Sequence, residues 1–377
     1  MYLAIRKEKQ AHDLLTWFGT IFLLESNSRL IFRPISRLGS PVRLICLLIC
    51  LLLQLPITAN AATYKIATIS PDGLSWMQKL RAGTKVIETK TDGRVKFKIY
   101  PGGVQGNDAT VLRKMRAGQL HGGAVAAGSL TRFYPDLQIY NLPLQFKSYD
   151  EVDYIRAAMD PIIAQGLDEA GITTFAFSET GFAYLLSQEP VRTVDELMSL
   201  KAWIPDGDPI SAELIKSFHV SPIPLNITDV LAGLQTGLID AVVVPPVVAL
   251  ALQWHNHVQY MTKLPLVYIY SMLAMDKSAF DRISIEDQLI VRATMDDIFR
   301  EVEADTRIDN VKALAALSAI GIETIEVSKD DLPAWQKVAD ESVASLIKSG
   351  EISSDGVQRY LDNLEQYRTG DQKPHED

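Results

Sequence analysis

The chain has 377 residues, of which 47% are hydrophobic and 22% charged, a composition ordinary for a soluble globular protein with room for two domains. Its formal net charge is −9 at pH 7. A nucleic-acid partner is therefore not expected, because binding to phosphates needs clustered Lys and Arg, and the body of the chain has no such run.

The start of the chain has the layout of a secretory leader. Arg33, Arg37 and Arg43 precede an apolar run at residues 44–55, and an A-x-A cleavage site ends at Ala61. The run is shorter than the roughly 20 apolar residues that span a bilayer. We therefore expect a signal peptide and export to the periplasm, with an uncleaved signal anchor as the alternative.

Strands and helices alternate after the leader. Short apolar or alternating runs predict strands at residues 63–70, 95–100, 122–127 and 172–177, with a strand at 183–187 pairing with the last of these. Helical spacing predicts helices at residues 76–88, 109–117 and 149–170. The glycine-rich loop at 101–106 has no phosphate-binding motif and is interpreted as a plain turn. This alternation predicts an α/β architecture in two lobes.

The stretch 190–248 contains the clearest start and stop signals. Thr193 and Glu196 form a capping-box pattern, Thr228 is placed to cap a helix, and Gly237 is placed to end it. The elements predicted here are helices at 193–198, 210–218 and 228–235 and extended segments at 200–204, 220–224 and 239–244. Loops at the ends of such strands are where open α/β sheets bind ligands.

The last third of the chain is dominated by one long helical pattern. Residues 285–319 have almost no helix breaker, and a helix of that length spans about 50 Å, enough to bridge both lobes. Around it we expect an apolar helix after Pro246, an extended segment at 260–275, a strand at 322–327 and helices at 332–349 and 358–367.

No catalytic or metal-binding constellation stands out. His255 and His257 are two residues apart, which places them on different faces of a helix and not as a metal pair. No Ser lies in a G-x-S-x-G context, and both cysteines, Cys46 and Cys50, lie in the apolar run of the leader. We therefore expect neither an enzyme nor a cofactor.

The segment DVLAGLQTGLIDAVVVPP, residues 229–246, resembles a segment that marks the solute-binding subunits of TRAP transporters. Three further segments are similar to that family and come in the same order, so the resemblance covers roughly residues 62–300: FKIYPGGVQGNDATVLRKMRAGQLHGGAV, YNLPLQFKSYDEVDYI and LMSLKAWIPDGDP.

This resemblance implies a two-lobed periplasmic binding protein fold, type II-like, with a central ligand cleft. After a leader at 1–61, residues 62–182 with 271–305 would form lobe I, and 183–270 with 306–377 lobe II. The implied role is a receptor that closes on a small organic solute and delivers it to membrane permease subunits driven by an ion gradient. A ligand-sensing subunit of a signalling receptor is the alternative.

Three positions depart from the family pattern. Where most members carry a carboxylate-binding Arg, a second Arg and an Asn, this chain has Trp203, Ala183 and Val244. A buried carboxylate needs a partner, usually a guanidinium, whereas an indole offers a large apolar face. We therefore expect a neutral, apolar or aromatic solute in preference to a small dicarboxylate.

Two alternatives to this expectation remain open. In the first, Arg192 or Arg132 reaches the pocket and preserves acid binding. In the second, a cationic solute binds the Trp203 ring through a cation–π contact, and Asp206 or Glu179 lies nearby. The other residues expected to line the cleft are aromatic: Trp76, Phe182, Tyr184, Trp254 and Tyr270.

Overall fold

A computed structural model describes residues 61–370, so the predicted signal peptide and both cysteines lie outside the described residues. The strands are β1 (Ala62–Thr68), β2 (Val95–Tyr100), β3 (Gly122–Ala126), β4 (Ile172–Thr174), β5 (Ser178–Ser187), β6 (Trp203–Pro205), β7 (Ile223–Leu225), β8 (Ala241–Val244), β9 (Tyr260–Asp276) and β10 (Glu323–Ile325). Most of the predicted elements are confirmed within a few residues.

The helices follow the predicted order. They are α3 (Ser75–Lys90), α4 (Asp108–Arg116), α5 (Tyr149–Glu169), α6 (Val194–Leu197), α7 (Pro209–Ser217), α8 (Val230–Thr236), α9 (Pro246–Ala251), α10 (Lys277–Phe280), α11 (Ile285–Ala319), α12 (Leu332–Ser349) and α13 (Ser354–Thr369), with 3-10 turns η2 (Ala127–Leu130), η3 (Pro135–Asn141), η4 (Ile227–Asp229) and η5 (Trp254–His257). Within residues 61–370, no helix combines the length and apolar character needed to cross a membrane.

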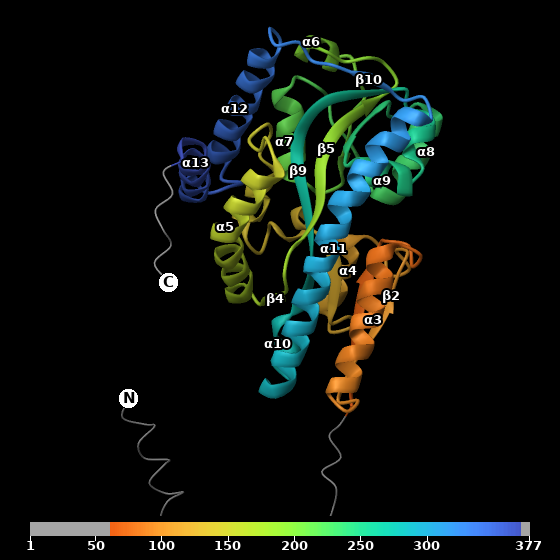
Figure 1. Ribbon diagram of the computed structural model, residues 1–377, viewed down its shortest axis with the longest axis vertical. Coiled ribbons are helices and arrows are strands. Elements are labelled where there is room, and N and C mark those ends of the chain that lie inside the picture. Colours follow the sequence, from red (N-terminus) through yellow and green to blue (C-terminus); the bar gives the residue numbers. More distant parts are fainter. Residues whose placement is uncertain (1–60, 371–377) are drawn as a thin grey trace, which may run out of the picture. The chain divides into compact units, whose positions relative to one another are not determined.

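The main sheet has eight strands and is built around β9 (Figure 1). Its central order is β2-β1-β3-β9-β5-β8, with β4 and β10 also paired to β9. β1 is parallel to β2 and β3, whereas β3, β4 and β5 run antiparallel to β9. A separate two-stranded parallel sheet joins β6 to β7. Because β9 spans 17 residues, a single strand links both halves of the fold.

The predicted pairing between residues 183–187 and 172–177 is wrong. β4 pairs with the last residues of β9, and β5 pairs with β9 from Ser271 back to Tyr260. The two strands therefore follow one another along β9 and do not lie side by side. The length of β9 provides room for both.

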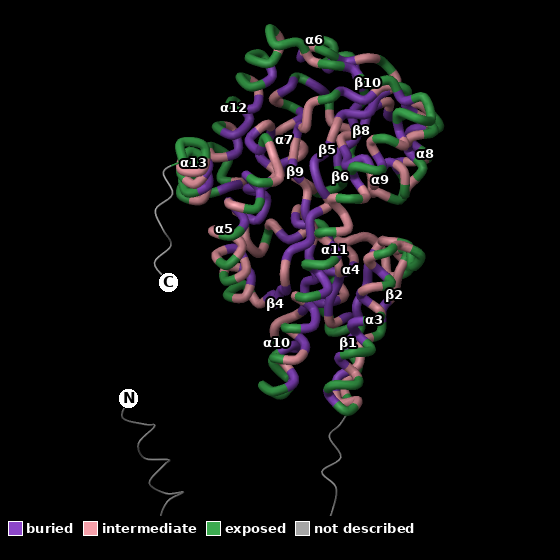
Figure 2. Tube along the Cα trace, viewed as in Figure 1, coloured by how far each residue is buried: buried purple, intermediate pink, exposed green. Residues whose placement is uncertain are grey.

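Four buried clusters form the core, and Figure 2 shows buried segments in both halves. We call them core 1 (with Tyr140, Ile155 and Tyr268), core 2 (with Leu80, Leu273 and Phe299), core 3 (with Leu197, Phe218 and Trp335) and core 4 (with Trp203, Leu234 and Trp254). Most residues of cores 1 and 2 come from the segments predicted for lobe I, and most residues of cores 3 and 4 from those predicted for lobe II.

The long helix α11 packs in both lobes. Ser284 caps its start by accepting a hydrogen bond from the backbone N–H of Asp287. Its first half contributes Val291 and Phe299 to core 2, and Leu317 near its end belongs to core 4. The predicted bridging helix is confirmed, with the predicted bounds.

The last two helices pack on different parts of the fold. α12 places Trp335 in core 3 and packs on α7, whereas α13 places Tyr360 in core 1 and packs on α5. The Arg368 guanidinium of α13 forms a 2.7 Å ion pair with the buried Glu151 carboxylate of α5. The chain after residue 306 therefore contacts both predicted lobes, and the boundaries between lobes stay a prediction.

Candidate functional site

The two lobes meet at loops that follow strands. Gln138 Nε2 donates to Asp208 Oδ1 over 3.0 Å, and the Asn107 amide donates to the Asn226 side-chain oxygen. Gly128 also lies here, since a Cβ added to it would come 3.3 Å from Asp208 Oδ2. Because ligands of α/β sheets bind outside the ends of strands, this junction is the candidate site.

Trp203 lies on the lobe II side with its polar group already engaged. Its indole Nε1 donates to the backbone oxygen of Leu225 over 3.0 Å, and its ring packs edge-on against Trp254 with centroids 5.2 Å apart. An indole has one donor and no acceptor. Trp203 is 8% exposed, so the small surface it presents is apolar, and it has no free hydrogen-bond donor.

The other two positions that depart from the family pattern are buried and apolar. Ala183 and Val244 lie on neighbouring strands, β5 and β8, and are 0% and 3% exposed. Tyr184 pairs with Val244 across these strands and packs against both core 1 and core 4. Burial raises the pKa of the Tyr184 hydroxyl. Tyr184 is therefore a predicted residue that contacts a core of each predicted lobe.

The remaining aromatics do not all gather at one place. Phe182 and Tyr270 belong to core 1, where the Phe182 ring lies 4.9 Å from that of Tyr149 and the Tyr270 hydroxyl donates to the Leu137 carbonyl. Trp254 is buried in core 4 beside Trp203, whereas Trp76 packs on core 2 from α3. The structure thus brings Trp203, Trp254, Val244 and Tyr184 together and places Trp76 elsewhere.

Glu179 belongs to a buried ion network that joins β5 to α11. Its carboxylate accepts hydrogen bonds from Arg307 at 2.9 Å and from the Tyr268 hydroxyl at 3.2 Å. Its other oxygen is buried with no partner among the described residues. These contacts link Glu179 to β9 and α11, and not to core 4, which contains Trp203.

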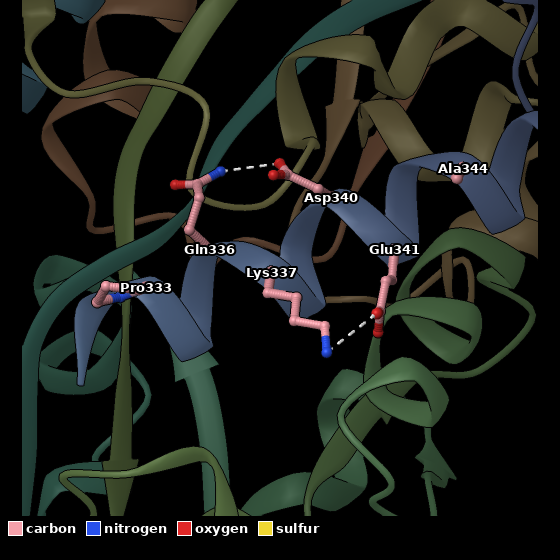
Figure 3. A pocket seen from close by; sticks show the side chains of 6 residues that line it. All are labelled: Pro333, Gln336, Lys337, Asp340, Glu341 and Ala344. Carbon is pink, nitrogen blue, oxygen red and sulfur yellow. Dashed lines mark hydrogen bonds and ion pairs between the residues drawn. The ribbon is translucent and has the colours of Figure 1, made fainter. Parts of the chain in front are cut away.

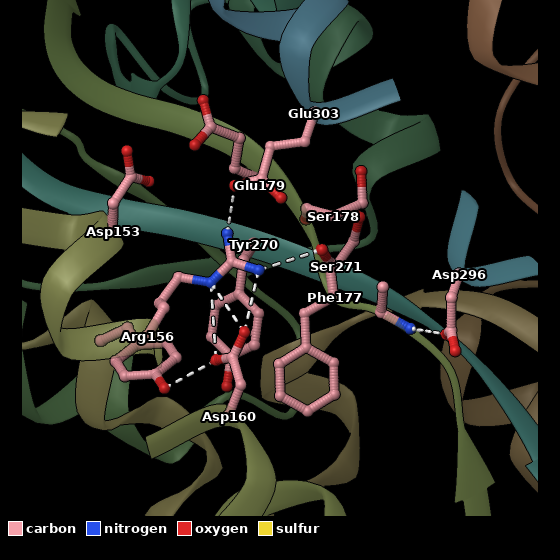
Figure 4. Close-up of polar contacts among 12 residues, drawn as sticks. Asp153, Arg156, Asp160, Phe177, Ser178, Glu179, Tyr270, Ser271, Asp296 and Glu303 are labelled. Carbon is pink, nitrogen blue, oxygen red and sulfur yellow. Dashed lines mark hydrogen bonds and ion pairs between the residues drawn. The ribbon is translucent and has the colours of Figure 1, made fainter. Parts of the chain in front are cut away.

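A second arginine completes this network (Figure 4). Arg156 of α5 is buried and pairs with Asp160 at 3.0 Å and with Glu303 at 2.5 Å. Burial, aided by the nearby Glu179 charge, raises the pKa of the Glu303 carboxyl to about 7, because these two effects outweigh the opposite effects of Arg156 and Arg307. The ion pair between Arg156 and Glu303 joins α5 to α11, and that between Arg307 and Glu179 joins α11 to β5.

Two aspartates follow β6, and the structure gives them different surroundings. Asp206 is exposed, whereas Asp208 caps α7 by accepting from the backbone N–H groups of Ile210 and Ser211. Because Asp208 also accepts from Gln138 of lobe I, it is the aspartate of this pair that takes part in the junction.

Sequence reasoning missed Asp108, next to the cross-lobe contact of Asn107. One oxygen of its carboxylate accepts from the Ala126 N–H at 3.0 Å and the Ser129 hydroxyl at 2.9 Å, and the other is buried without a partner in the described residues. Burial raises the pKa of Asp108. The loop 101–106 is interpreted from the sequence as a plain turn. The signal that could have indicated a site here is Asp108 itself, an acidic residue two positions after that loop.

A shallow, open depression of the surface lies elsewhere, on the outer face of α12 (Figure 3). All the residues that line it come from this one helix, and its polar side chains pair with one another: Gln336 with Asp340 at 2.9 Å, and Lys337 with Glu341 at 3.9 Å. No predicted residue lines it, so it is not the candidate site. Residues 61–370 contain no group of His, Cys, Asp and Glu side chains able to hold a metal ion.

Curated relatives share much of the chain at low identity. The C4-dicarboxylate-binding periplasmic protein DctP of Rhodobacter capsulatus is 23% identical over 260 residues, 67% of this chain and 77% of the relative. The 2,3-diketo-L-gulonate-binding periplasmic protein YiaO of Escherichia coli is 21% identical, over 64% of this chain and 74% of its own.

Solved structures show the same fold. A TRAP periplasmic solute-binding protein from Haemophilus influenzae with bound L-gulonate matches with a TM-score of 0.74 at 18% identity, covering 80% of this chain and 99% of that one. A protein of the same kind from Desulfovibrio salexigens with bound orotic acid matches with a TM-score of 0.73 at 18% identity, covering 81% and 99%. The expected two-lobed periplasmic binding protein fold is confirmed.

The family model described as "Bacterial extracellular solute-binding protein, family 7" matches residues 66–349, which is most of the chain. This family consists of solute receptors and not of enzymes. The chain therefore belongs to the DctP family of bacterial extracellular solute-binding proteins, the solute receptors of TRAP transporters.

Proposed function

We propose that this protein works in the periplasm as the receptor of a TRAP-type importer, closing its lobes on a small organic solute and delivering it to membrane subunits. Family membership and the names of its relatives support this role. A solute that contacts both lobes favours the closed state by its differential affinity. The cross-lobe hydrogen bond between Gln138 and Asp208 is a contact that such closure would make.

We further propose that the solute is neutral and apolar or aromatic. The observation that carries this proposal is the hydrogen bond from Trp203 Nε1 to the Leu225 carbonyl, which leaves the indole as an apolar wall. Ala183 and Val244 add no polar group. Relatives crystallised with acids, such as the Bordetella pertussis receptor that binds pyroglutamic acid, share the fold at 20% identity. A buried carboxylate without a cation is costly by several kcal/mol.

The contacts of the two alternative arginines support the same reading. The Arg132 guanidinium lies over the Phe133 ring, 4.9 Å from its centroid. The backbone carbonyl of Arg192 accepts a hydrogen bond from Trp335 Nε1 at 3.1 Å. None of the contacts described for either arginine involves Trp203.

A cationic or hydrogen-bond-donating group on the solute is the second candidate, and Asp108 favours it. Asp108 follows Asn107, which makes a cross-lobe contact, and its unpartnered buried oxygen would accept a hydrogen bond from an amine, an amide or a hydroxyl. This group would form the polar end of an otherwise apolar solute.

The first step of the test is to identify any compound that co-purifies with the protein. Native mass spectrometry of the mature protein purified from periplasm, followed by extraction, is expected to identify a neutral or weakly basic apolar compound. Calorimetric titration then compares that compound with succinate. We expect Trp203→Arg to weaken binding of the apolar compound and Trp203→Phe to keep it. A bound organic acid, or succinate binding more tightly than the apolar compound, would overturn the proposed solute class.

A further inference from the structure

Lobe I has a hollow of about 280 Å³ between the C-terminal ends of α4 and α5. Apolar side chains form much of its wall, with one cation and one carboxylate among its lining residues: Leu112, Met115, Phe133, Ile172, Arg116 and Asp276. Leu112, Met115 and Ile172 also belong to core 1, so this wall is a rigid part of the lobe.

Arg116 lines this hollow, and two further arginines, Arg113 and Arg132, lie near it; all three are exposed. Arg113 and Arg116 lie one turn apart on α4, and Arg132 comes from the loop after η2. Within residues 61–370, none of the three forms an ion pair. Partial burial and the charges of Arg116 and Arg113 lower the pKa of Arg132. Three positive charges close together without an acidic partner favour the binding of an anion beside them.

The helix dipole explains only part of this arrangement. Arg113 and Arg116 lie in the last turn of α4, where cations are favoured. Arg132 is not on that helix, yet its guanidinium lies over Phe133, a residue of the hollow, 4.9 Å from the ring centroid. A cation stacked on the aromatic wall places positive charge at the rim of the hollow.

We propose that this hollow binds a small organic monoanion, a carboxylate attached to a compact apolar body. Arg116 and Arg132 hold the carboxylate, for which a guanidinium is the preferred partner, and the apolar body packs against Leu112, Met115 and Ile172. Asp276 also lines the hollow, and its carboxylate already accepts hydrogen bonds from the Ser278 hydroxyl and the Ala279 N–H; its charge disfavours a second negative charge on the ligand, and so disfavours dicarboxylates.

This hollow is separate from the junction between the lobes. α4 begins with Asp108 at the junction and ends with Arg116 at the hollow, and its nine residues span about 13 Å. The pairing of β3 with β9 supports this separation. Asp276 of the hollow follows Met275, which pairs with Gly122 at the start of β3, whereas Ala126, which bonds Asp108, pairs with Ser271 at the other end. The proposed site therefore does not depend on the solute class proposed for the junction.

The test uses benzoate as the probe and benzamide as its neutral counterpart, titrated by NMR into the mature protein. We expect saturable benzoate binding that weakens at least fivefold in Arg116→Gln and in Arg132→Gln, with benzamide binding at least tenfold more weakly. Arg300→Gln is the matched control, because Arg300 is exposed and pairs with Asp297 at 2.9 Å on α11. It is expected to leave binding unchanged.

A fourth variant distinguishes the two sites. Trp203→Ala alters the junction and is expected to leave benzoate binding unchanged, while it weakens binding of the solute recovered from the cell. Absence of saturable benzoate binding, or equal binding by the wild type and both arginine variants, would overturn the proposal. Benzoate binding lost only in Trp203→Ala would place benzoate at the junction and equally overturn it.

Discussion

Tyr360 of α13 is fully buried in core 1, and its hydroxyl has no hydrogen-bond partner among the described residues. A buried polar group without a partner costs about 1–3 kcal/mol. We expect Tyr360→Phe to keep the ring packing on Phe146, 5.4 Å away, and to leave the free energy of unfolding unchanged or raise it by about 1 kcal/mol. Tyr360→Ala should lower it by about 3–5 kcal/mol. Urea unfolding measures both, and a lower midpoint for Tyr360→Phe would show that the hydroxyl has a partner such as water.

Gly181 lies in β5 at a bulge, where the pairing of β5 with β9 shifts register between Glu179 and Gly181. Its φ is +112°, and a Cβ there would lie 2.5 Å from Asn310 Nδ2. Asn310 in turn donates to the Thr180 carbonyl at 2.8 Å and accepts from the Val247 N–H at 3.3 Å, so it links α11 to both β5 and α9. Gly181 therefore permits the close approach that this link needs.

We expect Gly181→Ala to lower the free energy of unfolding by more than about 2 kcal/mol, through backbone strain and displacement of Asn310. Gly350→Ala is the control, because Gly350 also has a positive φ, +78°, but nothing lies within 4 Å of its added Cβ. Gly350→Ala should lower the free energy of unfolding by about 1 kcal/mol. Equal losses for the two variants in thermal or urea unfolding would show that the contact with Asn310 contributes nothing.

At the scale of elements, the ion network of α5, β5 and α11 predicts a pH dependence. The folded-state pKa of Glu303 is raised from 4.5 to about 7, so the folded protein binds this proton more tightly than the unfolded chain. The corresponding stability is present below pH 4.5 and is lost as the pH rises toward 7. We expect the difference in unfolding free energy between the wild type and Glu303→Gln to fall between pH 5 and 7.5.

Glu301→Gln is the matched control for this prediction. Glu301 is two residues away on α11, but its side chain is 68% exposed and pairs with Lys79 at 3.1 Å. Its difference from the wild type should vary little over the same range, because exposed pairs contribute little. Urea unfolding at four pH values measures both, and parallel curves for the two variants would refute a role for the Glu303 proton.

The elements that could be predicted are those with strong local signals. The helices at 285–319 and 332–349 have long periodic patterns, and the predicted bounds match those of α11 and α12. The helix expected from Thr228 begins instead at Val230, because η4 occupies the residues before it. The first half of β5 was missed, since Ser178-Glu179-Thr180-Gly181 is polar and ends in a glycine.

The site was harder to predict because its contacts join distant parts of the chain. The partner of Trp203 Nε1 is Leu225, 22 residues away and brought near by the parallel pairing of β6 and β7. Glu179 was expected near Trp203, but the charge that binds it is Arg307, 128 residues further on. No local pattern encodes such pairs, so residue type indicated the chemistry of these side chains but not their neighbours.

At the scale of the whole molecule, closure would depend on direct contacts between the lobes, such as that of Gln138 with Asp208. Gln138 is buried, and its amide donates to the Asp208 carboxylate, a hydrogen bond to a charged group worth about 1.5–3 kcal/mol. Because this bond joins residues of opposite lobes, we infer that it forms only when they close. Removing it should shift the equilibrium toward the open state and weaken solute binding about tenfold or more.

Gln138→Ala therefore tests closure, with Gln336→Ala as its control, because within residues 61–370 the side chain of Gln336 bonds only to Asp340 on the same helix. Small-angle X-ray scattering of the solute-loaded protein should give a larger radius of gyration for Gln138→Ala than for the wild type or the control. Calorimetry with the solute recovered from the protein should give a correspondingly higher Kd. If Gln138→Ala closes and binds like the wild type, the apolar surfaces around Trp203 and Tyr184 suffice to hold the lobes together, and solute burial alone determines closure.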